Sequence, residues 1–347
     1  MCMNVRSFLE SLLGRAPHIP EEIDATVEPL IATTPLEVGR TLTAWLYAGK
    51  TASLWARMSP EMRKVFGKQR KLTEFSAKVC RFTGIEQTPY AEWVALANDI
   101  DVYTRITFFT ETSEFMVVEW SFNQERVIEG LMVSPMRRGA PSRYNEYSTQ
   151  AVMSLPFGGE WYVFWGGRFV ESNYHAEATD QAFAMDFLII RDRRSHTGDG
   201  KRNEDYFCFG EPILAPGDGM VVASENSLLD QPPGVMNPSQ PLGNYVIIDH
   251  HTGEFSFLAH LQQGSVTVRP GMQVRRGDVI GKCGNSGNSS EPHLHYHLQN
   301  TATFGKGEGM PVQFADFDVN GARVRRGEVQ RGQVVRNAIV PAVKTSE

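Results

Sequence analysis

Residues 284–299 read GNSGNSSEPHLHYHLQ, a glycine- and serine-rich turn followed by histidines that alternate with apolar or aromatic residues. Successive side chains of a β-strand point to opposite faces, so His293, His295 and His297 are expected on one face. Imidazole rings gathered there need a metal ion or hydrogen-bonding partners, because an unpaired buried polar group is costly. The stretch therefore predicts a strand that carries a metal site.

The other polar residues point the same way. Of the 9 histidines, only His18 precedes residue 175. Asp186 stands in the apolar stretch AFAMDFLIIR at residues 182–191, where a carboxylate needs a cation or a donor. We therefore expect Asp186 to share a site with the histidines. The alternatives are a surface or salt-bridged aspartate and histidines that are only partly buried and hydrogen-bonded.

The second half of the chain predicts an all-β domain. Helical periodicity nearly disappears beyond residue 154, and short β-rich segments separated by glycine, proline and asparagine turns follow one another. Besides the stretches already quoted, these segments are 161–167, 219–224, 244–250, 255–261 and 273–284.

The first part of the chain predicts an α+β domain. From Ser7 to about Tyr90 the apolar residues recur at helical spacing, interrupted by prolines. Short β-rich runs follow at 102–109, 115–122 and 126–135. Helices followed by an antiparallel meander indicate a sheet wrapped on helices. This order resembles the small cone-shaped NTF2-like domains that sometimes precede a hydrolase, with a binding or spacing role.

Four segments are expected along the chain. Residues 1–134 form the α+β domain, and the polar, turn-rich residues 135–154 form a linker. Residues 155–300 form the all-β antiparallel domain, and residues 301–347 form a C-terminal β extension packed on it.

Composition narrows the function classes. With 34 basic against 40 acidic residues, the net charge of −6 offers no broad cationic field for nucleic acid. No run approaches the length of a membrane span, and residues 1–20, with Glu10 in the apolar stretch, do not read as a secretory signal. The 4 cysteines match no CxxC metal pattern and are expected as thiols.

The all-β domain resembles the M23 (lysostaphin/LytM-type) zinc metalloendopeptidases in residues that stand far apart along the chain. AMDF at residues 184–187 matches the family's aspartate strand, LAHL at 258–261 its middle histidine, and HLH at 293–295 its terminal pair. The glycine-punctuated stretches at 212–222 and 269–287 match its hairpins.

The resemblance implies one Zn²⁺ per chain and a role for each matched residue. His295 and Asp186 become metal ligands, and His260 and His293 become catalytic residues beside the metal. Common family members carry the first ligand four residues before the aspartate, where this chain has Ala182. The best candidate for that ligand is His175, with Asp180 as a less favoured oxygen donor.

The implied function is a zinc-dependent endopeptidase acting on peptide bonds in peptidoglycan stems or cross-bridges, in the periplasm or outside the cell. A cytoplasmic location is expected if the cell wall is not its substrate. The main alternative is a catalytically inactive module that binds cell-wall peptide or a partner protein, and Ala182 keeps it open. An esterase is also compatible with the metal chemistry. A lipoyl- or biotinyl-type carrier lacks the required exposed lysine in APGDGMV at 215–221.

Overall fold

The computed structural model describes residues 26–338. The chain divides into two compact units, and the boundary falls between Met136 and Arg137, within the expected linker. His18, Cys2 and the stretch compared with a secretory signal lie outside the described residues. Cys80, Cys208 and Cys283 are free thiols. Within the described part of the chain, no helix has the length and apolar character needed to cross a membrane.

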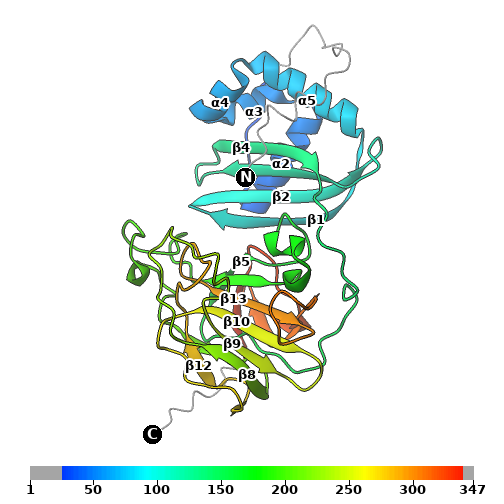
Figure 1. Ribbon diagram of the computed structural model, residues 1–347. Helices are drawn as coiled ribbons and strands as arrows, with labels where there is room; N and C mark the ends of the chain where they lie inside the picture. Colours follow the sequence, from blue (N-terminus) through cyan, green and yellow to red (C-terminus); the bar gives the residue numbers. More distant parts are fainter. Residues whose placement is uncertain (1–25, 339–347) are drawn as a thin grey trace. The chain divides into compact units, whose positions relative to one another are not determined.

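The first unit is an α+β domain, as its sequence predicts. Its helices gather on one side of an antiparallel 4-stranded sheet with the order β1-β2-β3-β4 (Figure 1). The helices are α2 (Pro35–Tyr47), α3 (Thr51–Arg57), α4 (Pro60–Phe66) and α5 (Gln69–Thr83). The strands are β1 (Glu86–Ala97), β2 (Ile100–Phe109), β3 (Met116–Phe122) and β4 (Ile128–Pro135).

Local sequence explains where these elements begin and end. Thr34 caps α2 in a capping box, since its hydroxyl accepts from the Glu37 amide while the Glu37 carboxylate accepts from the Thr34 amide. Gly84, with φ of 76°, ends α5. Asn98 and Asp99 both have positive φ, which suits the two-residue turn between β1 and β2.

Strand β1 corrects one sequence expectation. Helical spacing was expected as far as Tyr90, whereas the chain is extended from Glu86. Gly84 stops the preceding helix, and Pro89 is compatible with an edge strand because its missing N–H faces no neighbour there. The register of β1 against β2 shifts on both sides of Pro89.

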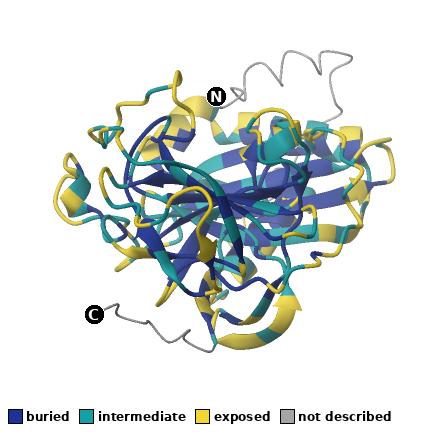
Figure 2. Ribbon diagram, turned by 60° about the horizontal axis from the view of Figure 1, so that its bottom comes forward, coloured by how far each residue is buried: buried dark blue, intermediate teal, exposed yellow. Residues whose placement is uncertain are grey.

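The second unit is built on an antiparallel 11-stranded sheet, which confirms the all-β prediction. Its order is β11-β8-β9-β10-β13-β6-β5-β17-β15-β16, with β14 also paired to β13, and β12 pairs separately with β7. Strands β8, β9, β10 and β13 lie side by side in Figure 1. In Figure 2 the strands are coloured mostly as buried and the connecting loops mostly as exposed.

The bounds of these strands follow the predicted β-rich segments, although the apolar stretch around Asp186 yields a strand of only 4 residues. They are β5 (Trp161–Trp165), β6 (Met185–Leu188), β7 (Pro212–Leu214), β8 (Gly219–Glu225), β9 (Asn244–Asp249), β10 (Phe255–Leu261), β11 (Gln273–Val274), β12 (Val279–Lys282), β13 (Leu294–Gln299), β14 (Gly309–Met310), β15 (Phe314–Val319), β16 (Ala322–Gly327) and β17 (Val334–Asn337).

The two ends of the second unit are tied into its sheet. Strands β15 to β17, from the expected C-terminal extension, continue the sheet beyond β5. Part of the expected linker is also held here, because the amides of Gln150 and Ala151 donate to the Glu254 carboxylate at 2.6 and 2.8 Å. Tyr147 donates to the same carboxylate at 2.9 Å.

Candidate metal centre

The centre forms where β6 and β13 run side by side. The strand register places Asp186 on β6 directly opposite His295 on β13, and Ala259 of β10 opposite His295 on its other side. Because directly opposed residues point to the same face of a sheet, the ladder brings the carboxylate and the imidazole together. Oδ1 of Asp186 lies 2.9 Å from Nδ1 of His295.

His175 reaches the same carboxylate from a short 3₁₀ helix, η1 (Tyr174–Glu177). Asn173 caps this helix by accepting from the His175 amide, and its amide group donates to the Gly167 carbonyl at 3.0 Å. Nε2 of His175 then lies 3.0 Å from Oδ2 of Asp186. The structure therefore brings the distant His175 to the predicted pair.

Among residues 26–338, these side chains form the one group of histidine, cysteine and carboxylate residues arranged to hold a metal ion. The ligand atoms of His175, Asp186 and His295 lie within 4.8 Å of one another, and all three residues are buried. Two imidazole nitrogens and one carboxylate oxygen are donors that zinc accepts, and three protein ligands leave a coordination position open. The donor set therefore fits a zinc ion.

The electrostatics of the cluster keep its carboxylate ionised. Burial alone would raise the pKa of Asp186, but electrostatic attraction to His175 and His293 and the hydrogen bonds of His175 and His295 outweigh burial. They hold the pKa of Asp186 well below its usual range. Burial lowers the pKa of His295, so its ring is neutral at neutral pH, the form that binds metal.

His260 lies beside this cluster because β10 departs from regular strand geometry there. The register between β10 and β9 shifts between Leu258 and Leu261, and His260 has φ of 61°. Its Nδ1 lies 2.8 Å from the Ser286 carbonyl, which can only accept a hydrogen bond. Nδ1 therefore carries the proton, and Nε2 is left with a lone pair.

His293 has the same arrangement at the start of β13. Its Nδ1 lies 2.8 Å from the Glu291 carbonyl, so this nitrogen also carries the proton. Its Nε2 lies 3.7 Å from Oδ1 of Asp186, and the rings of His260 and His293 are 4.7 Å apart. The side chain of His293 is 12% exposed, so solvent reaches this side of the cluster.

In both histidines Nδ1 is bound to a backbone carbonyl, and Nε2 is the nitrogen left to accept a proton. Burial, and the electrostatic repulsion that a protonated His260 would meet from His293 and His295, hold the pKa of His260 well below its usual range. A backbone position with positive φ costs a histidine about 1–3 kcal/mol, a cost that buried functional sites often retain. The arrangement can accept a proton beside the ligand cluster.

Asn285 ties two long loops to this site. Its amide group donates to Oδ1 of Asn203 at 3.0 Å and to the Gln231 carbonyl at 2.8 Å. Residue 285 directly precedes Ser286, whose carbonyl holds His260. The loops that contain Asn203 and Gln231 are therefore linked to the segment that orients His260.

Three further histidines of the second unit, His196, His250 and His251, make their contacts outside the cluster. His196 packs on Tyr206, and its Nδ1 lies 3.1 Å from the Thr197 carbonyl. His251 is exposed at the turn between β9 and β10, whereas the neighbouring His250 is buried. The ring of His250 is enclosed by two polar atoms, the Asp218 carbonyl and the Ser256 hydroxyl, each at 2.7 Å.

Two residues close to His175 along the chain, Asp180 and Tyr174, are not among the converging ligand residues. Asp180, the alternative donor, accepts instead from the Gly305 amide at 3.0 Å. Tyr174, which sequence reasoning missed, has its ring 3.9 Å from the His175 ring. Only its position next to His175 could have pointed to Tyr174, because a partly exposed tyrosine before a histidine is not a distinctive sequence pattern.

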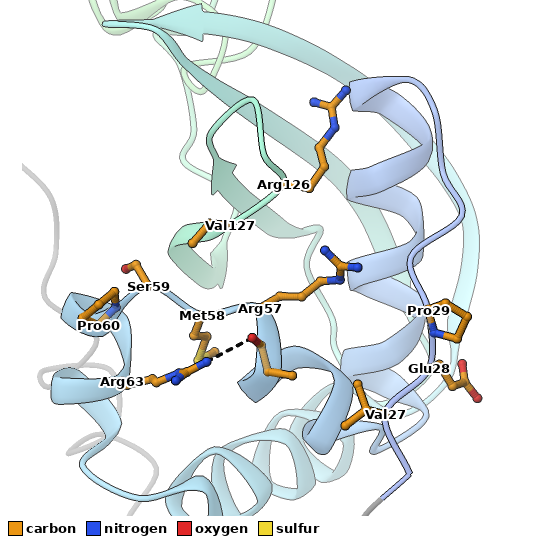
Figure 3. Close-up of a pocket in the computed structure, with 11 residues that line it drawn as sticks. Val27, Glu28, Pro29, Arg57, Met58, Ser59, Pro60, Arg63, Arg126 and Val127 are labelled. Atoms are coloured by element: carbon orange, nitrogen blue, oxygen red, sulfur yellow. Dashed lines mark hydrogen bonds between the residues drawn. The ribbon is translucent and has the colours of Figure 1, made fainter.

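A separate cavity of about 600 Å³ lies in the first unit (Figure 3). Its charged lining includes Arg57, Arg63 and Arg126. Arg63 binds the Ala56 carbonyl at 3.0 Å, and Arg126 pairs with Asp101 at 3.2 Å. All lining residues belong to the first unit, so this cavity is not part of the histidine cluster.

Sequence comparison gives a family match and two related bacterial enzymes. Residues 202–310 match the model of Peptidase family M23. The peptidoglycan DD-endopeptidase ShyA of Vibrio cholerae serotype O1 is 37% identical over 89 residues, which are 26% of this chain and 17% of ShyA. ShyC, a peptidoglycan DD-endopeptidase of the same organism, is 28% identical over 187 residues, which are 50% of this chain and 38% of ShyC. The chain spans less than half the length of either relative.

Solved structures give weaker similarities. A zinc-containing peptidase from Vibrio cholerae is 16% identical, with 60% of this chain and 55% of that chain covered and a TM-score of 0.27. Lysostaphin from Staphylococcus simulans is 17% identical, with 46% of this chain and 48% of that chain covered and a TM-score of 0.25. The fold described above rests on its own strand pairing.

The family match and the centre overlap in part. The matched segment contains His260, His293 and His295, while His175 and Asp186 precede it along the chain. These last two reach the segment through η1 and through the pairing of β6 with β13. This chain therefore contains a Peptidase family M23 domain, whose matched residues are 202–310.

Proposed function

We propose that this chain is a zinc-dependent endopeptidase that hydrolyses peptide bonds in peptidoglycan. The observation that carries the proposal is the convergence of His175, Asp186 and His295 on one point, with the proton-accepting nitrogens of His260 and His293 beside it. The M23 match over residues 202–310 supports a peptidase. The activity named for ShyA and ShyC supports peptidoglycan as the substrate.

In this proposal the ligands are His175 through Nε2, Asp186 through its carboxylate and His295 through Nδ1. Zinc bound there supplies Lewis acidity and makes water a better nucleophile at neutral pH. His175 replaces the ligand that Ala182 lacks, so the donor set still has three members. This argues against the catalytically inactive alternative.

The two flanking histidines handle protons. His293 is the more exposed of the two and takes the proton of the attacking water at Nε2, since its Nδ1–H is occupied by the Glu291 carbonyl. Once protonated, the same nitrogen donates to the leaving amine. His260 lies 4.7 Å from this ring and is anchored by Ser286, so its Nε2 orients the water.

Metal analysis and a digestion assay on the purified protein test this function together. We expect about one zinc per chain and release of soluble fragments from purified cell-wall sacculi, with both lost after chelation and restored by added zinc. Mass spectrometry of the fragments identifies the bond that is cut. Zinc binding without any fragment release would favour a binding module, and digestion that survives complete removal of metal would contradict the mechanism.

A further inference from the structure

Beyond His295, the same face of β13 carries two more buried polar side chains. His297 is 1% exposed and Gln299 is fully buried, and the two follow His295 at alternate positions of the strand. Their surroundings are largely apolar, because the His297 ring stacks on Phe257 with centroids 4.5 Å apart and lies 6.3 Å from Phe304. Burying polar atoms in such a place is costly unless each finds a partner.

The contact between the His295 and His297 rings constrains which ring nitrogen carries the proton between them. Nε2 of His295 lies 2.9 Å from Nδ1 of His297, and a hydrogen bond there needs one donor and one acceptor. Nδ1 of His295 faces Asp186 at 2.9 Å and must carry a lone pair when it binds metal. The proton of His295 is then on Nε2, and Nδ1 of His297 must accept it.

Gln299 provides the complementary atom for the next proton. Its amide nitrogen donates to the carbonyls of Thr301 and Thr303 at 2.6 and 3.0 Å, which uses both amide hydrogens and sets the side-chain orientation. Its Oε1 is left as an acceptor, and this atom and Nε2 of His297 are both buried without another partner. A neutral His297 that accepts at Nδ1 carries its proton on Nε2, the atom that Oε1 of Gln299 can satisfy.

We propose that His297, oriented by Gln299, is a positioning residue that holds His295 in the tautomer with its proton on Nε2 and thereby strengthens zinc binding. The inference rests on the proposed function because it takes Nδ1 of His295 as the metal-binding atom. Partners that orient a metal-binding histidine typically contribute about 10- to 100-fold in metal affinity. If His297 only fills space beside Phe257, the affinity is insensitive to its hydrogen-bonding atoms.

The test measures the zinc affinity of the chain of residues 1–347 by competition with a chromogenic chelator. His297→Phe keeps an aromatic ring against Phe257 but removes the acceptor, and we expect it to weaken zinc binding about 10- to 100-fold. His297→Asn places an amide oxygen near the position of Nδ1 and is expected to restore affinity to within about threefold. Unchanged affinity in His297→Phe overturns the inference.

Tyr296→Phe is the matched control. It removes the hydrogen bond between the Tyr296 and Ser256 hydroxyls, 3.0 Å long and equally buried, from the opposite face of the same strand. We expect zinc affinity to stay within about twofold of the unmodified protein, because this bond does not touch His295. A loss as large as that of His297→Phe would assign the effect to general loosening of the strand and overturn the inference.

A second measurement needs no variant and decides the case even if His297→Phe does not fold. Nitrogen NMR of protein labelled at histidine reports which ring nitrogen carries the proton. We expect His297 to be protonated at Nε2 and bare at Nδ1 in the zinc-loaded protein, and the opposite tautomer overturns the inference. Absence of zinc binding in the unmodified protein overturns the proposed function itself, whereas normal zinc binding with the wrong tautomer overturns only the role of His297.

Discussion

At the residue scale, the proposed function assigns metal binding and proton transfer to different side chains. The ligand atoms of His175, Asp186 and His295 converge, whereas His260 and His293 are turned by carbonyl groups that occupy their Nδ1 protons. Substitutions in the two sets should therefore have different consequences for metal content and turnover.

His293→Ala should keep zinc and lose turnover. The ring is not among the ligand atoms that converge, but its Nε2 accepts the proton in the proposed mechanism. We expect the rate of sacculus digestion to fall about 10²- to 10⁴-fold, the usual contribution of a general base. Metal analysis and digestion of the same preparation check this, and simultaneous loss of zinc would move His293 into the ligand set.

The His175→Ala variant should fold like the unmodified protein but lose most of its zinc. Removing one of three donors leaves Asp186 and His295 unable to hold the ion with comparable affinity. Asp180→Ala is the matched control, because this residue stands in the same loop but binds the Gly305 amide and not the cluster. Retention of both metal and activity in His175→Ala would show that another residue supplies the first ligand.

His250 gives the protein a dependence of stability on pH. Burial lowers the pKa of His250 below the value of about 6.5 that it has in an unfolded chain. Above that pH neither state is charged and this residue contributes no pH dependence. Below it the unfolded chain takes up a proton that the folded protein resists, so the free energy of unfolding falls by up to about 1.4 kcal/mol per pH unit.

Denaturant unfolding of the metal-free protein between pH 7.5 and 5 measures this effect. His250→Asn should lower stability at pH 7.5 by removing the bonds to Asp218 and Ser256, but should show a shallower loss on acidification. His251→Asn, at the exposed neighbouring position, should keep the original slope. If stability falls equally steeply with pH in the unmodified protein and in both variants, His250 is not the source of the pH dependence.

At the scale of an element, the capping box of α2 predicts a local stability effect. Thr34→Ala removes the hydroxyl that accepts from the Glu37 amide and should lower the free energy of unfolding of the first unit by about 1 kcal/mol. Thr41→Ala is the control, because this exposed hydroxyl bonds only the Glu37 carbonyl within the helix and alanine favours helix. An equal loss in both variants would contradict a specific role for the cap.

Elements also show how far the sequence could be read. Strand β13 and its histidines followed from period-2 alternation, and Asp186 from the cost of an isolated carboxylate in an apolar stretch. Strand β1 was missed in part because EQTPYAEWVALA at Glu86–Ala97 alternates poorly between buried and exposed positions. The burial of His250 could not be predicted from the sequence, because its enclosure depends on the Asp218 carbonyl, which no local pattern reveals.

The backbone carbonyls that orient His260 and His293 could not be predicted from the sequence either. Ser286 and Glu291 act through backbone carbonyls, which every residue possesses, so their identity gives no signal. The selection of His175 required the family resemblance, since it lies eleven positions before Asp186 and only the fold of η1 closes that distance. The expected NTF2-like character of the first unit stays a prediction.

At the scale of the whole molecule, each unit has its own core, and the candidate metal centre belongs to the second unit alone. A buried core that includes Leu42, Tyr103 and Trp120 lies wholly within the first unit, while every ligand atom of the centre lies in the second. Residues 137–347 produced alone should therefore fold and bind zinc with the affinity of the full chain. Competition with a chelator checks this, and weaker binding by the shorter protein would give the first unit a part in metal retention.

Asn285 joins two distant loops to the segment that holds His260. The amide group of Asn285 donates to both Asn203 and Gln231, and the carbonyl of the next residue accepts from His260. A displacement of either loop would therefore also shift the imidazole. If the proposed function holds, a peptide bound against these loops would change the orientation of the His260 ring, whereas a substrate too short to touch them would leave that orientation unchanged.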